Sequence, residues 1–242
     1  MPLCAKAQTD YDALMNIPKK LPIVKTFGVA GAGAWGTALA VVAAGGPKGT
    51  NPVTLWSFEP ETAADINATL ENKAFLPGVA LPQCIKATDN LEDLSACDAV
   101  LMVVPAQFAR PVLKNLSEHL RPTTPIILCS KGIEQSSLKL MSDVAAEFFA
   151  PERIAVLSGP SFAADVARGL PTAVTLACED EALGQALSAG LGQKTFRPYL
   201  SSDIIGTEIG GAIKNSNAIT CGIVQGKKLG ETARPAVTAR GF

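Results

Sequence analysis

The fold of this chain is decided by one stretch, which reads Gly28-Val29-Ala30-Gly31-Ala32-Gly33-Ala34-Trp35-Gly36-Thr37-Ala38-Leu39-Ala40. Gly31, Gly33 and Gly36 fit the spacing G-x-G-x-x-G between an apolar run and a helix of small residues. The first glycine allows a tight turn, the second lets a pyrophosphate approach the backbone, and the third lets the helix pack close to the strand. The start of the helix offers free N–H groups and the positive end of its dipole. The stretch therefore predicts a dinucleotide site, with a glycine-rich structural turn as the alternative.

Apolar runs and helical stretches alternate along the rest of the chain. We expect strands at residues 26–30, 53–58, 99–104, 125–129, 154–158 and 173–177, and helices at 60–72, 107–120, 138–149 and 181–191. This alternation predicts an α/β fold of Rossmann type, a mostly parallel sheet with helices on both faces, whose ligand lies beyond the carboxyl ends of the strands. The expected organisation is a loose extension over 1–22, a dinucleotide-binding domain over 23–200, and the incomplete beginning of an all-α substrate domain over 201–242.

Composition bounds the class of protein. The 242 residues carry a net charge of -1, so there is no basic footprint for nucleic acid. No apolar run reaches the roughly 18–20 residues of a membrane span. The six cysteines are scattered without a C-x-x-C pair, which indicates reduced core thiols in a cytoplasmic protein. The single histidine, His119, lies near the end of an expected surface helix, and we expect no metal site.

Several expected strands end in candidate ligand-binding residues. Glu59 follows the second strand, where an acidic residue often holds the adenine ribose, although a solvated helix cap explains it equally well. Phe58 could pack on adenine, and the absence of a neighbouring arginine mildly favours NAD over NADP. Pro105 would stiffen a loop beside the cofactor. Lys131 is either an ordinary solvated lysine or, at this strand end, a contact for a substrate anion or a nicotinamide-side carbonyl.

A glycine-rich helix over residues 203–226 carries the second informative pattern. Four-residue spacing places on one face Gly206, Gly210, Lys214, Ala218 and Gly222. This face is almost bare, so another backbone or a cofactor can approach it, with a helix-packing seam as the alternative. Hydride transfer to a carbonyl needs a proton donor. With His119 placed at a helix end, Lys214 is the plausible acid and base, and a nearby Lys131 would lower its pKa toward neutrality. Another turn follows Gly159, and Ser161 can cap the helix after it.

Together these motifs resemble the NAD(P)-dependent glycerol-3-phosphate dehydrogenases of bacterial type. The similarity covers about residues 25–242 and rests on residues 31–40, Leu55-Trp56, residues 72–78, Val103-Val104-Pro105, Ser130-Lys131-Gly132-Ile133-Glu134, Ser158-Gly159-Pro160-Ser161-Phe162-Ala163, residues 169–173, Glu208-Ile209-Gly210-Gly211-Ala212-Ile213-Lys214-Asn215, Ala233-Arg234 and residues 238–242.

The resemblance implies roles for individual residues. Ala34 and Trp35 would meet the pyrophosphate through their backbone, and Phe58 would lie by the adenosine. Lys131 would touch both the cofactor, NAD or NADP, and the substrate. The resemblance further implies substrate contacts at Gly159 and Ser161, a cofactor contact at Ala163, and Lys214 as the group that exchanges the proton. The implied reaction interconverts dihydroxyacetone phosphate and sn-glycerol 3-phosphate, which feeds phospholipid synthesis; a homodimer is possible.

The family pattern continues beyond Phe242, where it supplies an Asp near Lys214 and an Arg-Asn pair for the substrate phosphate. We therefore expect a truncated chain with weak cofactor binding, little activity of its own and a tendency to self-associate. Two other classes of protein share part of this pattern. A dehydrogenase of the 6-phosphogluconate or ketopantoate type would share the glycine turn but not the motifs around Lys131 and Lys214. A catalytically impaired dinucleotide-binding fragment is the alternative from a different class.

Overall fold

The computed structural model describes residues 24–240, so the expected extension over 1–22 lies outside the described residues. The strands are β1 (Phe27–Ala30), β2 (Val53–Trp56), β3 (Ile85–Thr88), β4 (Ala99–Met102), β5 (Ile126–Leu128), β6 (Ile154–Ser158), β7 (Thr172–Cys178) and β8 (Phe196–Ser201). The α-helices are α2 (Ala34–Ala43), α3 (Pro60–Thr69), α4 (Ala106–His119), α5 (Met141–Ala146), α6 (Ala163–Ala167), α7 (Glu181–Leu191), α8 (Ile204–Gly226) and α9 (Ala233–Arg240). Two short 3₁₀ helices are η1 (Leu91–Ala96) and η2 (Pro151–Arg153).

All eight described strands form one sheet in the order β3-β2-β1-β4-β5-β6-β7-β8. Neighbouring strands run parallel except for β6 and β7, which pair antiparallel. The order reverses between β1 and β4, which is the switch point where doubly wound sheets bind ligands. The expected Rossmann-type sheet, mostly parallel, is confirmed.

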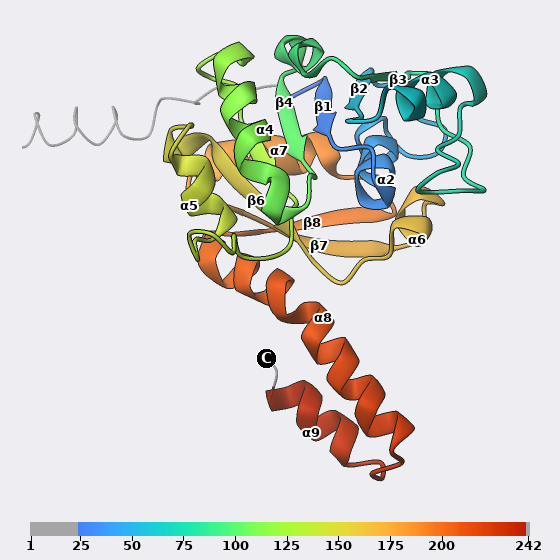
Figure 1. Cartoon of the computed structure of the whole chain (residues 1–242), viewed down its shortest axis with the longest axis vertical. Helices are drawn as coiled ribbons and strands as arrows, with labels where there is room; N and C mark the ends of the chain where they lie inside the picture. Colours follow the sequence, from blue (N-terminus) through green and yellow to red (C-terminus); the bar gives the residue numbers. More distant parts are fainter. Residues whose placement is uncertain (1–23, 241–242) are drawn as a thin grey trace, which may run out of the picture.

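Helices cover both faces of this sheet (Figure 1). The alternation along β4 shows how the two faces arise: Leu101 belongs to the hydrophobic cluster under α2, α3, α6 and α7, whereas Val100 and Met102 belong to the cluster under α4 and α5. Because these side chains are fully buried on both sides, the sheet is the rigid support of the molecule.

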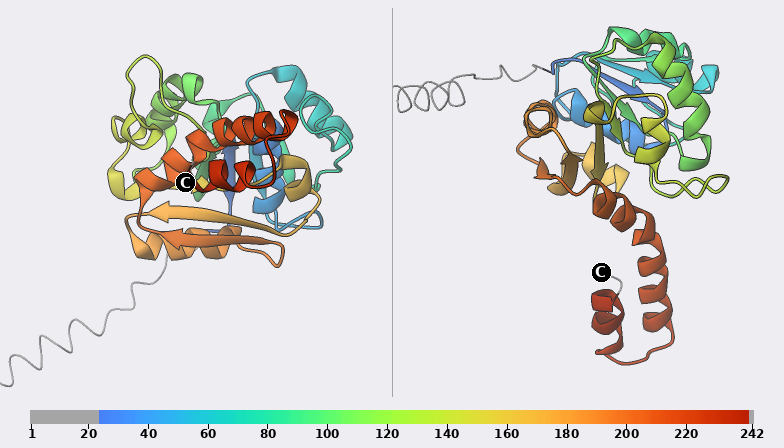
Figure 2. Two further views of the ribbon diagram at one scale, coloured as in Figure 1. Left: turned by 90° about the horizontal axis from the view of Figure 1, so that it is seen from below. Right: turned by 90° about the vertical axis from the view of Figure 1, so that its left-hand side faces the viewer.

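The C-terminal helices α8 and α9 project away from the α/β body and lie side by side (Figures 1 and 2). Only the first part of α8 touches the sheet, at β6 and β7. Asp203 caps α8 by accepting a hydrogen bond from the backbone N–H of Gly206 at 2.8 Å. The helix expected over 203–226 is therefore present, with its first turn fixed against the body.

Several features of the fold differ from the sequence expectation, and one is the helix expected over 138–149, which spans only Met141–Ala146. Strands β3 and β8 were not predicted, because β3 alternates apolar and exposed residues over a short span and β8 contains Pro198, which is tolerated at the edge of a sheet. The antiparallel β7 arises because a short connection with α6 turns the chain straight back along β6. Helix α3 ends before Asn72, since Leu70 adopts a left-handed backbone.

Candidate functional site

Each glycine of the turn between β1 and α2 has a different spatial constraint. Gly31 has φ +118°, and a Cβ there would lie 3.2 Å from the backbone of Val103 and Val104. A Cβ on Gly36 would lie 1.8 Å from the carbonyl oxygen of Gly31, so α2 can start this close to the turn only without a side chain. A Cβ on Gly33 meets nothing within 4 Å. The turn therefore leaves an open, exposed backbone at Gly33, where the expected pyrophosphate would approach.

A buried asparagine holds this turn in shape. Asn72 is 1% exposed, and its Nδ2 donates hydrogen bonds of 2.7 Å to the carbonyl oxygen of Ala32 and to Oγ1 of Thr37. Its Oδ1 accepts from the backbone N–H of Phe75 at 3.1 Å. These partners lie on the glycine turn, on α2 and in the loop after α3. Asn72 therefore ties that loop to the glycine turn. Sequence reasoning noted this residue only within the family resemblance.

A cavity of about 290 Å³ opens beside the turn. Its lining comes from α2, from the ends of β4 and β5, and from the segment after β6, and consists of Ala34, Trp35, Val103, Val104, Pro105, Cys129, Ser130, Lys131, Ser161 and Ala163. Six of these are residues that the sequence marks as site candidates. The indole Nε1 of Trp35 is buried and has no hydrogen-bond partner within residues 24–240. Trp35 thus lines the cavity and carries a buried donor that the described residues leave unsatisfied.

Two lysines from distant parts of the sequence converge here. Lys131 lies in the loop after β5, with its Nζ 5.9 Å from the centroid of the Trp35 ring and 3.5 Å from the carbonyl oxygen of Gly159, to which it donates. Lys214 of α8 donates to the carbonyl oxygen of Ser161 at 3.4 Å, and its Nζ lies 5.6 Å from the centroid of the Phe162 ring. The structure thus brings together the two cations that the sequence singled out.

Burial first, then the charge of Lys214 and a side-chain hydrogen bond with it, lower the pKa of Lys131 to about 8. The neighbouring Cys129 thiol acts weakly in the opposite direction. Two ammonium groups this close repel each other, so the pair favours an anion between them or the loss of one proton. The lowered pKa thus lies on Lys131, with Lys214 as one cause, whereas the sequence analysis expected Lys131 to act on Lys214.

A close approach of backbones places Lys214. A Cβ on Gly211 would lie 2.5 Å from Oγ of Ser158, so this glycine lets α8 cross the end of β6. Gly210 and Gly222, by contrast, have no atom of the described structure within 4 Å of a Cβ. The expectation that another backbone or a cofactor approaches the Gly210–Gly222 face therefore stays a prediction, since no described atom lies there. The contact with the sheet lies one residue off that face, at Gly211.

The segment after β6 carries the remaining substrate candidates. A Cβ on Gly159 would lie 3.0 Å from Cα of Val174, so the chain turns tightly against β7 there. Ser161 lines the cavity, but the expectation that it caps a helix is wrong. Helix α6 begins later, at Ala163, so its capping position falls on Phe162, whose side chain makes no cap hydrogen bond. This leaves the Ser161 hydroxyl at the cavity wall.

The adenosine-side candidates lie at the end of β2. Phe58 is 79% exposed, and its ring meets Trp56 edge-on with centroids 6.3 Å apart. Glu59 occupies the capping position of α3 without a side-chain cap hydrogen bond and accepts one from Oγ of Ser57 at 3.3 Å. The exposed face of Phe58 is thus open to a planar ligand, while Glu59 stands at the helix start as a solvated carboxylate.

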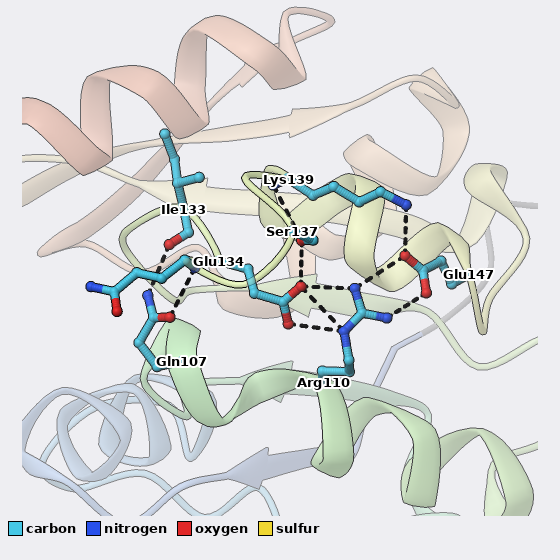
Figure 3. Close-up of polar contacts among 8 residues, drawn as sticks. Gln107, Arg110, Ile133, Glu134, Ser137, Lys139 and Glu147 are labelled. Carbon is cyan, nitrogen blue, oxygen red and sulfur yellow. Dashed lines mark hydrogen bonds and ion pairs between the residues drawn. The ribbon is translucent and has the colours of Figure 1, made fainter.

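A polar network that sequence reasoning missed supports the Lys131 loop (Figure 3). Arg110 of α4 forms a 2.8 Å ion pair with the buried carboxylate of Glu134 and also pairs with Glu147. Lys139 adds a 2.9 Å ion pair to Glu147. Gln107 donates from Nε2 to the carbonyl oxygen of Ile133 at 2.8 Å. These contacts link residues far apart in sequence, so no local pattern could signal them.

The described residues also bear on metal sites, membrane-spanning helices and disulfides. Residues 24–240 contain no group of three or more histidine, cysteine or acidic side chains arranged to hold a metal ion. In that part of the chain, no helix has the length and apolar character needed to cross a membrane. The described cysteines are free thiols: Cys84, Cys97, Cys129, Cys178 and Cys221.

The reversed strand order, the open glycine turn and the cavity beside it define the class: a Rossmann-type dinucleotide-binding fold. Comparison with known proteins narrows it. Residues 26–184 match the family described as NAD-dependent glycerol-3-phosphate dehydrogenase N-terminus, and residues 203–242 match the corresponding C-terminus. The chain belongs to the NAD-dependent glycerol-3-phosphate dehydrogenase family.

Relatives of known sequence and structure support the same family assignment. A glycerol-3-phosphate dehydrogenase (NAD(P)+) of Caulobacter vibrioides is 58% identical over 215 residues, which is 89% of this chain and 64% of the relative. One from Maricaulis maris is 56% identical over 90% of this chain and 65% of the relative. The crystal structure of glycerol-3-phosphate dehydrogenase from Coxiella burnetii superposes with a TM-score of 0.82 at 36% identity, covering 91% of this chain and 67% of that one. The chain thus spans somewhat less than two thirds of these curated relatives.

Proposed function

We propose that this chain binds NAD or NADP and, with the remainder of the family's fold, interconverts dihydroxyacetone phosphate and sn-glycerol 3-phosphate. The observation that carries the proposal is the convergence of Lys131 and Lys214 beside the cavity at the glycine turn. A phosphorylated ketone needs both a cation and a proton donor, and these two side chains offer both. The identity to the named dehydrogenases supports the same reaction.

The residues of the turn fit a dinucleotide. The space over Gly33 is open, the first N–H groups of α2 at Ala34 and Trp35 are available to a pyrophosphate, and the Trp35 indole N–H lacks a partner in the described structure. The proposed set is Gly31, Gly33, Ala34, Trp35, Gly36, Phe58, Pro105, Lys131 and Ala163. When bound, the nicotinamide supplies a hydride to the carbonyl carbon in the reducing direction and receives it in the oxidising direction.

The chain's own residues supply the remaining chemistry. We assign to Lys214 the proton given to the carbonyl oxygen during reduction, and taken from the hydroxyl during oxidation. Lys131 attracts the anionic ligands and, by its charge, favours proton release from the lysine pair. Ser161 lines the cavity, and the carbonyl oxygen of Gly159 accepts a hydrogen bond from Lys131, which supports assigning both residues as substrate contacts.

The setting of this activity is also proposed. The free thiols support a cytoplasmic location, where the product would supply phospholipid synthesis. The body over 23–200 would hold the cofactor and the segment over 201–242 would begin the substrate domain. We further propose that the protein forms a homodimer. Light scattering of the chain completed with the remainder of the family's fold tests it: the mass of a single copy would exclude the dimer.

The test of the function compares turnover in matched proteins. The chain is fused to the part of the Caulobacter vibrioides relative that lies beyond the match, and NADH oxidation is followed with dihydroxyacetone phosphate. Lys214→Met should lower turnover by at least about 10²-fold, the lower range of general acid catalysis. The control Lys227→Met removes an exposed lysine after the end of α8 and should leave turnover unchanged. Near-normal turnover of Lys214→Met would contradict the assigned role.

A further inference from the structure

A buried carboxylate outside the cavity joins two elements that carry the site. Glu208, in the second turn of α8, is 7% exposed. Its carboxylate accepts a 2.9 Å hydrogen bond from the backbone N–H of Ser142 and another from the Ser142 hydroxyl. Burying a carboxylate is costly unless it is hydrogen-bonded, so Glu208 holds the start of α8 against α5.

The spacing along α8 relates this contact to the site. Glu208, Gly211 and Lys214 follow one another at three-residue intervals, so Gly211 neighbours both Glu208 and Lys214 on the surface of the helix. Gly211 faces Ser158 at the end of β6, and Lys214 reaches the carbonyl oxygen of Ser161. The Glu208 contact is thus the first of three attachments, and Lys214 is the last.

The partner of Glu208 is itself tied to the other lysine. Helix α5 carries Ser142 near its start, and Glu147 directly follows its end. Glu147 pairs with Arg110, and Arg110 pairs with Glu134 in the loop that begins with Lys131 (Figure 3). Both lysine-bearing segments are therefore attached to α5, one at each end.

We propose that α5 is a bracket that sets the separation of the Lys131 and Lys214 ammonium groups, with Glu208 as the positioning residue for Lys214. The proposal rests on the proposed function only in that Lys131 and Lys214 serve there to attract the anion and to transfer the proton. The hydrogen-bond partner of Glu208, Ser142, does not line the cavity. Glu208 therefore acts on the site through the placement of α8.

The electrostatics agree with this geometry. Lys214 contributes to the lowered pKa of Lys131, so any change in their separation changes that pKa. Around Glu208, burial raises the pKa of the carboxyl, the hydrogen bonds from Ser142 and the Met141 backbone lower it, and the carboxylate of Asp143 raises it. The charged group that raises the pKa of Glu208 is thus Asp143, which lies beside Ser142 on α5.

The experiment measures the pKa of Lys131 in the full chain without substrate. Competitive acetylation with acetic anhydride is run over a pH series, and the labelled Lys131 peptide is quantified by mass spectrometry. Four proteins are compared: the unchanged chain, Glu208→Ala, Lys214→Met, and the double variant. In Glu208→Ala we expect the pKa of Lys131 to rise from about 8 toward 10.5. In the Lys214→Met background, Glu208→Ala should cause no further rise, because the neighbour that it positions is already gone.

The controls separate positioning from folding. Glu208→Gln keeps an acceptor for the Ser142 N–H and should titrate Lys131 close to the unchanged chain. If circular dichroism shows that Glu208→Ala does not fold, Ser142→Ala replaces it and should give a smaller rise. The proposal is overturned if the folded variant titrates Lys131 like the unchanged chain, or if Glu208→Ala raises the pKa equally with and without Lys214. Because no turnover is measured, a failure of the proposed function would not alter either result.

Discussion

Two glycines of the same turn should respond in opposite ways to substitution. At Gly36 a Cβ would lie 1.8 Å from the Gly31 carbonyl oxygen, whereas at Gly33 it meets nothing within 4 Å. Gly33 has φ −67° and ψ 178°, a backbone that any residue adopts. Gly36→Ala should therefore damage the fold and spare the ligand surface, and Gly33→Val should do the reverse.

The magnitudes follow from these distances. Overpacking typically costs about 1–3 kcal/mol, and the Gly36 overlap with rigid backbone lies at the upper end. The gain of alanine over glycine in a helix offsets about 1 kcal/mol. The net loss of roughly 2 kcal/mol should lower the Tm by about 4–8 °C for a protein of this size. Gly33→Val gives up a glycine cap, which costs about 1 kcal/mol or less, but fills the space over the turn.

The assay measures both quantities on the same samples. Thermal unfolding gives the Tm, and titration of NADH fluorescence gives the affinity. Gly33→Val should weaken NADH binding at least about tenfold, or about 1.4 kcal/mol, with the smaller change in Tm. Unchanged NADH affinity in Gly33→Val would refute the placement of the cofactor, and an unchanged Tm in Gly36→Ala would refute the packing argument.

Three further predictions concern the surroundings of the site. Because Lys131 attracts anions only when protonated and its pKa is about 8, NADH affinity should fall as pH rises through about 8. In Lys131→Met, fluorescence titrations over the same pH series should give a constant NADH affinity. A fall of the same size in Lys131→Met would contradict the role of Lys131 in attracting the anion. Arg110 lowers the pKa of Glu147 to about 2, so its contribution to stability is present above the unfolded pKa of about 4.5 and is lost as pH falls toward 2. Arg110→Gln should therefore move the acid-unfolding midpoint, followed by circular dichroism, to higher pH, and an unmoved midpoint would show that the pair contributes nothing. Gly211→Ala should lower the Tm while Gly210→Ala keeps or raises it; equal effects would mean that α8 does not depend on its contact with β6.

The glycine turn and the lysines were predictable because their constraints are local or chemical. The spacing of Gly31, Gly33 and Gly36 dictates a backbone shape within a few residues, and the structure shows a separate steric reason for Gly31 and Gly36. Lys131 follows a strand, so its place at the carboxyl edge follows from the alternation of elements alone. The buried strands were predictable for the same reason, because a continuous apolar run indicates a buried strand without knowledge of its neighbours in the sheet.

What could not be predicted depends on contacts between distant residues. Asn72, Arg110 and Glu208 are ordinary polar residues in sequence, and only the fold brings their partners within reach. Strand β8 contains a proline and several exposed residues, so its membership of the sheet depends on pairing with β7. The direction of β7 could not be predicted either, because it depends on how the connection through α6 returns the chain alongside β6.

The central claim is that hydride passes between the dinucleotide and the substrate carbonyl while Lys214 handles the proton. The direct measurement uses NADH deuterated at the transferable position of the nicotinamide, with the fused protein and dihydroxyacetone phosphate. The account predicts glycerol 3-phosphate with one deuterium on its central carbon, formed at least about 10²-fold more slowly by Lys214→Met. Product without deuterium would contradict hydride transfer, and deuterated product formed at an unchanged rate by Lys214→Met would contradict the assigned proton donor.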